Sequence, residues 1–303
     1  MSNETENKKQ AAEDVQVEKE FLVKAGKPFL KQKRAFTTNL QFFPCPDDLA
    51  KEKAIDRTGR EYYRNLIWTY NLGKFDFTAL GQADYGLPYG IVSRLIINWI
   101  DNEIIYNSNG KKIKDAYGGY KIKWSETITE FCINKLGITK HSKVLKEIQS
   151  QFEKIAGMTF KTVITDVDSR EERSIPFVVD KKFKWMNDIV VEDDSWIIIH
   201  PVYVNYVLKR KFYVAPNIMK LFLRNPEGID LYKYFKYIKN TQKTATTIKI
   251  SEIRDKLGFK GKSANLLRKV EIIADRINAN DDSIFIDIVK GTNQNIETVI
   301  IIN

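Results

Sequence analysis

Few residues of this chain have the types and spacing that catalysis requires. His141 and His200 are the only histidines among 303 residues, and they form no His-x-His or His-x-x-x-His pair. Metal-assisted strand cleavage needs such ligands, so it is not indicated, although tyrosine is plentiful. Acidic pairs such as Glu171-Glu172 and Asp193-Asp194 lie in turn-like segments, where solvated carboxylates are more usual than a general acid and base. We therefore predict no catalytic residue and no metal ligand.

A short glycine-containing stretch raises the question of nucleotide binding. Gly261-Lys262-Ser263 resembles the end of a phosphate-binding loop. That motif requires another glycine five residues before Gly261, where this chain has Lys256, and it must follow a buried strand rather than the helix expected here. Nucleotide binding is not indicated, and we expect no cofactor.

The charge balance points to an anionic partner. Lys and Arg total 49 against 39 Asp and Glu, which gives a net charge of +10. Lysine mostly contacts phosphates, whereas Asn pairs bidentately with adenine and Arg with guanine. For any one basic residue a solvated surface charge is the alternative. On the elements described next, we predict DNA contacts from Lys140, Lys143, Lys146, Lys262, Asn265, Arg268, Lys269 and Lys290.

The elements that would position Lys140, Lys143 and Lys146 begin with a core helix. Residues 91–106 are apolar nearly all round, which predicts a helix packed on several sides. Arg94, Asn98 and Asp101 interrupt the run well before ~18 apolar residues, so we expect no membrane span. A short strand over 121–124 follows, and then a helix over 126–136 with Ser125 as its N-cap.

Gly137 is expected to close that helix, and Thr139 to start the next one. In this third helix Leu145, Ile148, Phe152 and Ile155 form one apolar face, which leaves Lys143 and Lys146 on the other. Two β-rich runs, 158–165 and 175–179, are predicted to pair as a hairpin. Helix, strand, helix, helix and hairpin is the order of a winged helix-turn-helix, whose third helix enters the major groove.

The same order recurs in the last third of the chain. A helix over 229–239, a strand over 246–250, and a helix over 252–257 with Ser251 as its N-cap are predicted. A final hairpin joins 283–289 to 296–302. The helix before this hairpin has an apolar stripe, and the candidate DNA contacts Lys262, Asn265, Arg268 and Lys269 lie off it. The stripe is formed by Leu266, Val270, Ile273 and Ile277. We therefore predict a mainly α fold with small β-hairpins, made of two tandem winged helix-turn-helix domains. The expected divisions are a flexible tail over 1–27, an N-terminal domain over 28–200 and a C-terminal domain over 201–303.

The cysteine pattern and the N-terminus bear on the compartment. Cys45 and Cys132 lie far apart and neither belongs to a Cys-x-x-Cys pair, so neither a zinc site nor a disulfide framework is predicted. Residues 1–20 have no apolar segment typical of a secretory signal. We expect a protein of the reducing cytoplasm.

Three motifs together resemble the RepA-type plasmid replication initiators. The first is Leu87-Pro88-Tyr89-Gly90 followed by Ser93-Arg94 and a Trp-containing helix; Ser93 stands where the family usually has Pro. The others are 128–137, similar to the family's Leu-x-x-Phe-x-x-x-Leu-Gly, and Asn225-Pro226-Glu227-Gly228-Ile229-Asp230-Leu231-Tyr232, similar to Ser-Pro-x-Ala-x-Asp-x-Tyr. With Arg60-Glu61-Tyr62 upstream, the resemblance covers the chain from about residue 40 onwards.

The resemblance implies a non-enzymatic protein that binds double-stranded DNA at origin repeats (iterons). It further implies opening of the origin, recruitment of the host initiator and helicase, and a monomer–dimer equilibrium in which the dimer represses the protein's own promoter. A winged-helix transcriptional regulator and an origin-nicking enzyme remain as alternatives. Binding to direct repeats rather than to one palindrome would distinguish an initiator from a transcriptional regulator. A covalent tyrosine adduct with DNA would indicate an origin-nicking enzyme.

Overall fold

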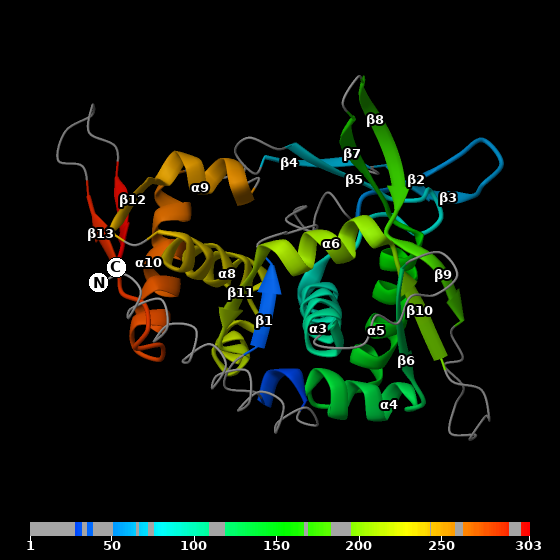
Figure 1. The fold of residues 1–303 in the computed structure, drawn as a ribbon, viewed down its shortest axis with the longest axis horizontal. Coiled ribbons are helices and arrows are strands. Elements are labelled where there is room, and N and C mark those ends of the chain that lie inside the picture. Colours follow the sequence, from blue (N-terminus) through cyan, green and yellow to red (C-terminus); the bar gives the residue numbers. More distant parts are fainter. Residues whose placement is uncertain are drawn as a thin grey trace, which may run out of the picture.

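A computed structural model describes residues 28–31, 35–38, 51–64, 67–71, 76–108, 119–166, 169–182, 195–242, 244–257, 263–290 and 298–303 (Figure 1). Within these ranges helices alternate with five small antiparallel sheets. The fold is therefore mixed, and the expectation of a mainly α protein is only partly right. The expected tail over 1–27 lies outside the described residues.

The first unit contains the predicted helix, strand, helix and helix, completed by a three-stranded sheet. Its sheet has the order β6-β10-β9, so the last strand lies between the other two. The elements of this unit are α3 (Gly90–Ser108), β6 (Tyr120–Trp124), α4 (Ile128–Glu130) continuing into η2 (Phe131–Leu136), α5 (Ser142–Gly157), β9 (Val178–Lys182) and β10 (Ser195–Ile199).

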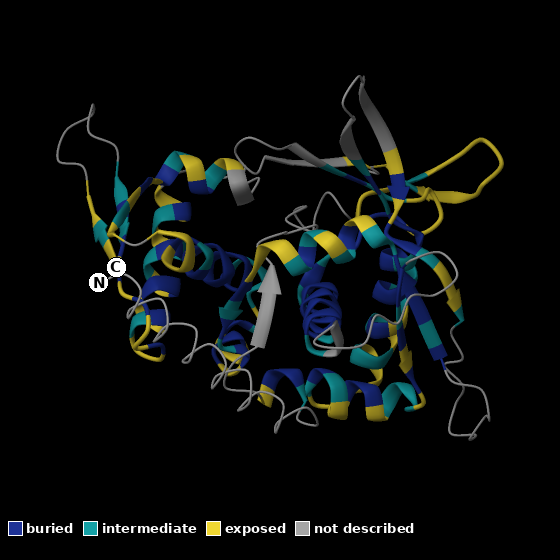
Figure 2. Cartoon of the chain, in the orientation of Figure 1, coloured by how far each residue is buried: buried dark blue, intermediate teal, exposed yellow. Residues whose placement is uncertain are grey.

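Helix α3 confirms the predicted core helix. Trp99 is 2% exposed, and its ring makes edge contacts with Phe131 at 4.9 Å and Trp124 at 6.0 Å between centroids. Gly90, at the helix start, has φ +74, a conformation that L side chains rarely adopt. Figure 2 shows α3 buried along most of its length.

Local capping differs from the prediction at two helix starts. Thr127, not Ser125, caps α4: its hydroxyl accepts from the Glu130 N–H, and the Glu130 carboxylate accepts from the Thr127 N–H. The third helix begins at Ser142 rather than at Thr139. Gly137 closes η2 with φ +78, as predicted.

A hairpin follows α5, but it lies in another sheet and its second strand runs over residues 169–176, so the charged segment predicted as the connection is mostly strand. β7 (Thr159–Asp166) pairs with β8 (Ser169–Pro176), and both join β4 (Ile67–Asn71) and β5 (Asp76–Leu80) in the order β4-β5-β7-β8. The chain runs from β8 through Phe177 into β9, so the sheet of the first unit is made by β9 and β10 instead. Sequence alternation identifies a strand but not its partner, which is why the prediction was wrong here.

The second unit repeats the strand order of the first. Its sheet is β12-β14-β13, again with the last strand in the middle. Helix α9 already begins at Ile250, so the predicted N-cap at Ser251 is wrong. The elements are α8 (Pro226–Thr241), β12 (Thr246–Lys249), α9 (Ile250–Leu257), α10 (Ser263–Asn278), β13 (Ile286–Val289) and β14 (Val299–Ile302).

A connecting segment links the two units and receives the N-terminal part of the chain. β11 (Lys211–Val214) pairs with β1 (Ala35–Thr38), so strands from both sides of the boundary predicted at residue 200 share one sheet. The His200 side chain caps α6 (Pro201–Arg210) by accepting from the Val202 N–H. The remaining elements are η1 (Phe29–Lys31), β2 (Lys53–Ile55), β3 (Glu61–Tyr63), α7 (Pro216–Met219) and η3 (Lys220–Phe222).

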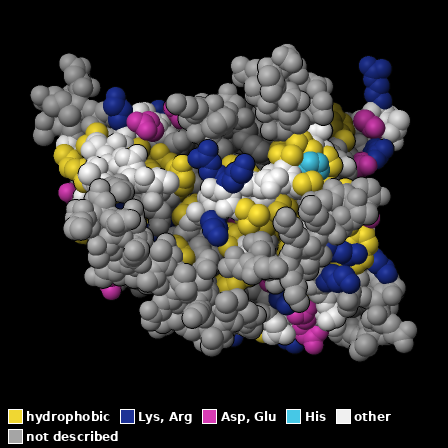
Figure 3. Space-filling view, viewed as in Figure 1, with side chains coloured by type: hydrophobic (Ala, Val, Ile, Leu, Met, Phe, Trp, Pro, Cys, Tyr) yellow, Lys and Arg dark blue, Asp and Glu magenta, His cyan; other side chains and the backbone are white. Residues whose placement is uncertain are grey.

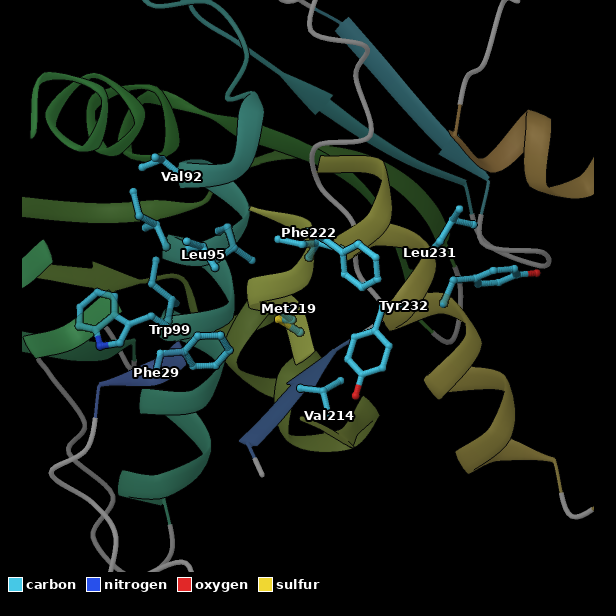
Figure 4. Packing of buried hydrophobic residues seen from close by; sticks show 14 of the residues in the cluster. Phe29, Val92, Leu95, Trp99, Val214, Met219, Phe222, Leu231 and Tyr232 are labelled. Carbon is cyan, nitrogen blue, oxygen red and sulfur yellow. The ribbon is translucent and has the colours of Figure 1, made fainter. Parts of the chain in front are cut away.

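One hydrophobic core runs through both units and the connecting segment. Figure 4 shows Leu95 and Trp99 of α3 on one side, with Met219 and Phe222 of the connecting segment between α3 and α8. Helix α3 packs against α5, α6 and α8. The first helices of the two units are therefore in contact, and the units share buried surface.

Candidate nucleic-acid interface

Helix α5 presents a basic face to solvent. Its inward side buries Ile148, Phe152 and Ile155, each at most 1% exposed. Lys143 and Lys146, three residues apart and hence neighbours on the helix surface, are both exposed. Lys140 is exposed in the segment just before the helix. Two of the three lysines predicted in the first unit thus lie on α5, and the third lies in the exposed segment that leads into it.

Helix α10 presents a mixed amide and guanidinium face. Leu266, Val270 and Ile273 are buried, which confirms the predicted apolar stripe. Asn265 and Arg268, three residues apart, are exposed. Asn265 has a side chain that can read a base edge, and Arg268 has one that can read a base edge or contact a phosphate. The two are therefore suitably placed neighbours on this helix.

Two of the predicted basic residues are held in ion pairs. Lys269 Nζ lies 2.6 Å from Glu227 Oε2 of α8, and Lys290 Nζ lies 2.7 Å from Glu271 Oε1. All four side chains are partly exposed, so the pairs are screened by water and weak. DNA phosphates would have to compete with these carboxylates for both lysines. Lys262 lies outside the described residues.

Among the residues that the structure describes, the Lys and Arg side chains on the face shown in Figure 3 lie apart from one another rather than in one continuous patch. Separate basic groups are visible there, one of them near the centre of the face. An interface with DNA would therefore depend on which elements project from the surface and how they are spaced, as well as on total charge.

Sequence reasoning missed a buried polar cluster between α3 and α8. Arg94 Nε lies 2.9 Å from both carboxylate oxygens of Asp230, and Arg94 Nη2 lies 2.7 Å from Oδ2. The two side chains are 7% and 4% exposed. Arg94 and Asp230 each belong to one of the motifs quoted above, 136 residues apart. The sequence does carry a signal for this pair, because each of the two motifs has a charged residue next to apolar positions.

Further polar contacts surround this ion pair. Lys233 Nζ donates to Asn98 Oδ1 at 2.7 Å, and the Tyr203 hydroxyl donates to Asp101 Oδ1 at 2.5 Å. Burial lowers the pKa of Lys233, while the nearby Asp101 and Asp230 carboxylates raise it. The interruptions of the apolar run in α3 are thus partners of residues on α6 and α8, and they do not face solvent.

The first motif also contacts α5. The backbone N–H of Tyr89 donates to Oε1 of the buried Gln151 at 3.0 Å, and Lys154 donates to the Tyr85 carbonyl. Lys154 Nζ lies 4.0 Å from the centre of the Tyr63 ring, and burial lowers the pKa of this lysine. This end of α5 is therefore fixed by the motif and by β3.

Other kinds of site have little support in the described part of the chain. No cluster of three or more His, Cys, Asp or Glu side chains there could hold a metal ion. Burial raises the pKa of the Cys132 thiol to about 11, so the reactive thiolate is scarce at neutral pH. Among the described residues no helix has the length and apolar character to cross a membrane.

Comparison with known proteins gives a fold relationship. No family model and no curated protein sequence matches the chain. A crystal structure of domains 2 and 3 of RctB is similar, with a TM-score of 0.50 and 11% sequence identity. The match covers 84% of this chain and 95% of that one. At this identity the similarity shows a shared fold, and it extends across both units.

Proposed function

We propose that this chain is a plasmid replication initiator that binds double-stranded DNA in a sequence-specific manner at repeated origin sites. One observation carries the proposal: two units share the same element order and the same strand order, and each has a third helix with a polar, basic exposed face. In the proposal each unit is a winged helix, in which the third helix enters the major groove and the sheet's hairpin lies against the backbone.

Three further observations support the proposal. The net charge of +10 favours a polyanionic partner. The motifs that resemble RepA-type initiators meet in space, since Arg94 of the first binds Asp230 of the last. The fold is shared with domains 2 and 3 of RctB across both units. In this proposal the protein binds and opens DNA without cleaving it.

The two third helices have distinct roles in this proposal. Lys140, Lys143 and Lys146 on and before α5 contact phosphates, whereas Asn265 and Arg268 on α10 read base edges. With both helices in successive major grooves on one face of the duplex, their centres lie ~34 Å apart and the site spans about two turns. Recruitment of host initiator and helicase proteins, and repression by a dimer, belong to the same proposal.

Footprinting of the purified chain on DNA flanking its own gene tests the function. We expect protection of several direct repeats, each about two helical turns long. Protection of a single palindrome would instead indicate a transcriptional regulator. A covalent tyrosine adduct on supercoiled DNA in the presence of a divalent metal would overturn the non-enzymatic assignment.

A further inference from the structure

We propose that the buried Arg94–Asp230 ion pair sets the spacing and relative orientation of α5 and α10, so that the chain accepts two DNA half-sites at only one separation. This inference rests on the proposed function, because it assigns α5 and α10 to DNA. It gives the pair a positioning role: neither side chain contacts DNA itself.

The geometry of the pair is directional. Arg94 Nε and Nη2 both donate to the Asp230 carboxylate at 2.7 to 2.9 Å, while Nη1 donates to the Gly90 carbonyl at 2.8 Å. A planar guanidinium that is held on two sides fixes orientation as well as distance. Since Gly90 begins α3 and Asp230 lies in α8, this one side chain sets how the two helices meet.

A continuous path of contacts extends from this pair to both DNA-reading helices. Towards α5, the Tyr89 N–H binds Gln151, and Gly90 lies so close to Glu147 that an added Cβ would be 3.2 Å from its Oε1. Towards α10, helix α8, which contains Asp230, packs directly against α10. The ion pair is the central link between these two ends.

The neighbouring contacts limit rotation about the pair. Lys233, one turn after Asp230, binds Asn98, one turn after Arg94. The Tyr232 hydroxyl donates to Asp281 Oδ2 at 2.7 Å and accepts from the Ala215 N–H, which ties α8 to the connecting segment. Two successive polar links between α3 and α8 resist both sliding and rotation of one helix on the other.

The chemistry of buried ion pairs separates orientation from stability. Replacing both partners by apolar residues of similar size is often neutral for folding, whereas removing one partner leaves an uncompensated charge. The double variant Arg94→Met/Asp230→Leu therefore removes the directional link while keeping the α3–α8 contact apolar and packed. Lys53→Met/Glu61→Leu makes the same chemical change at an exposed pair within the β2–β3 hairpin, 2.8 Å apart, and is the matched control.

The test measures affinity against half-site spacing. The probe is a duplex that the wild-type chain selects from a random-sequence pool, used unchanged and with an insertion of about five base pairs, half a helical turn, between its half-sites. We expect the wild type and the Lys53/Glu61 control to lose about tenfold or more in affinity on insertion. The Arg94/Asp230 double variant is expected to lose less than about threefold in affinity on the same insertion.

A second measurement reports on the helices without DNA. In a Cys45→Ser background, spin labels at the exposed positions Gln149→Cys on α5 and Asp275→Cys on α10 give a distance distribution. We expect a narrow distribution in the otherwise unchanged chain and a broad one in the double variant. This second readout also serves if the double variant binds DNA too weakly for the first.

The outcomes separate the inference from the function on which it rests. If the wild type selects no sequence, the proposed function fails, and a narrow distance distribution in the double variant then overturns the positioning role as well. If the wild type selects a site and the double variant shows the same spacing penalty and the same narrow distribution, the inference fails while the proposed function stands.

Discussion

At the scale of single residues, the structure divides the charged side chains into those that hold the fold and those that face solvent. Arg94, Asp230 and Lys233 are each at most 7% exposed. Arg94 binds Asp230, and Lys233 binds Asn98 of the same pair of helices. Lys143, Asn265 and Arg268 are exposed. Lys269 and Lys290 stand between these groups, since each is exposed in part and is paired with a glutamate. Substitutions in the two groups should therefore affect different measurements.

Asp230→Ala should lower the free energy of unfolding by ~3 to 5 kcal/mol, because it leaves the buried Arg94 guanidinium without its partner. Chemical denaturation followed by circular dichroism measures this change. Glu61→Ala breaks the exposed pair with Lys53 and should cost at most ~1 kcal/mol. Equal costs for the two variants would show that the Arg94–Asp230 contact is not a buried, compensated pair.

Arg268→Ala should lower affinity for the selected site by ~1 to 3 kcal/mol and relax the choice of base at one position, since a bidentate contact to guanine is lost. Lys143→Ala should weaken all sequences alike, because a lysine on a phosphate carries no sequence information. Binding to a library of sites measures both effects. Arg224→Ala removes an equivalent exposed charge outside both units and is the control. The assignment fails if Lys143→Ala changes base preference and Arg268→Ala does not.

At the scale of elements, α3 is the helix on which the first unit depends. It packs on α5, α6 and α8 and carries the aromatic contacts of Trp99 with Phe131 and Trp124. Each unit also contains one three-stranded sheet in which the last strand of the unit lies in the middle. Damage to α3 should therefore affect the first unit most directly and reach the second through α8.

Trp99→Ala should cost ~3 to 5 kcal/mol, as truncation of a buried aromatic usually does, and this is a large part of a stability of ~5 to 15 kcal/mol. Thermal melts followed by circular dichroism would show a lowered melting temperature or no folded baseline. Tyr62→Ala truncates an aromatic side chain that is 38% exposed and should melt close to the wild type. A Trp99→Ala melt that matches the wild type would contradict the central place of α3.

At the scale of the whole molecule, the basic surface should make binding strongly dependent on salt. A plot of the logarithm of the binding constant against the logarithm of the salt concentration has a slope of about −0.9 for each phosphate that the protein neutralises. Because α5 and α10 would each contact several phosphates, the slope should be considerably steeper than about −1. Titrations of a fluorescent duplex between low and physiological salt measure the slope. A flat dependence would be incompatible with the proposed function.

The sequence by itself determined the local elements. The period of the apolar residues predicted α3, α5, α8 and α10, and Gly137 was correctly placed as a helix end, because hydrophobic spacing and backbone preference act over one or two turns. The order helix, strand, helix, helix in each half also followed from these local patterns, whereas the sheet that completes the first half did not. So did the exposure of Lys143, Asn265 and Arg268, which lie opposite the apolar stripes.

Only the tertiary structure decided which elements are partners. The β-rich runs 158–165 and 175–179 predicted strands but could not show that β7 and β8 join β4 and β5, because a strand's edge accepts any partner of suitable register. The same holds for β1 with β11 and for Arg94 with Asp230, whose meeting depends on how α3 packs against α8. A polar residue in an apolar helix indicates that a partner exists, and only the fold shows which residue, 136 positions away, it is.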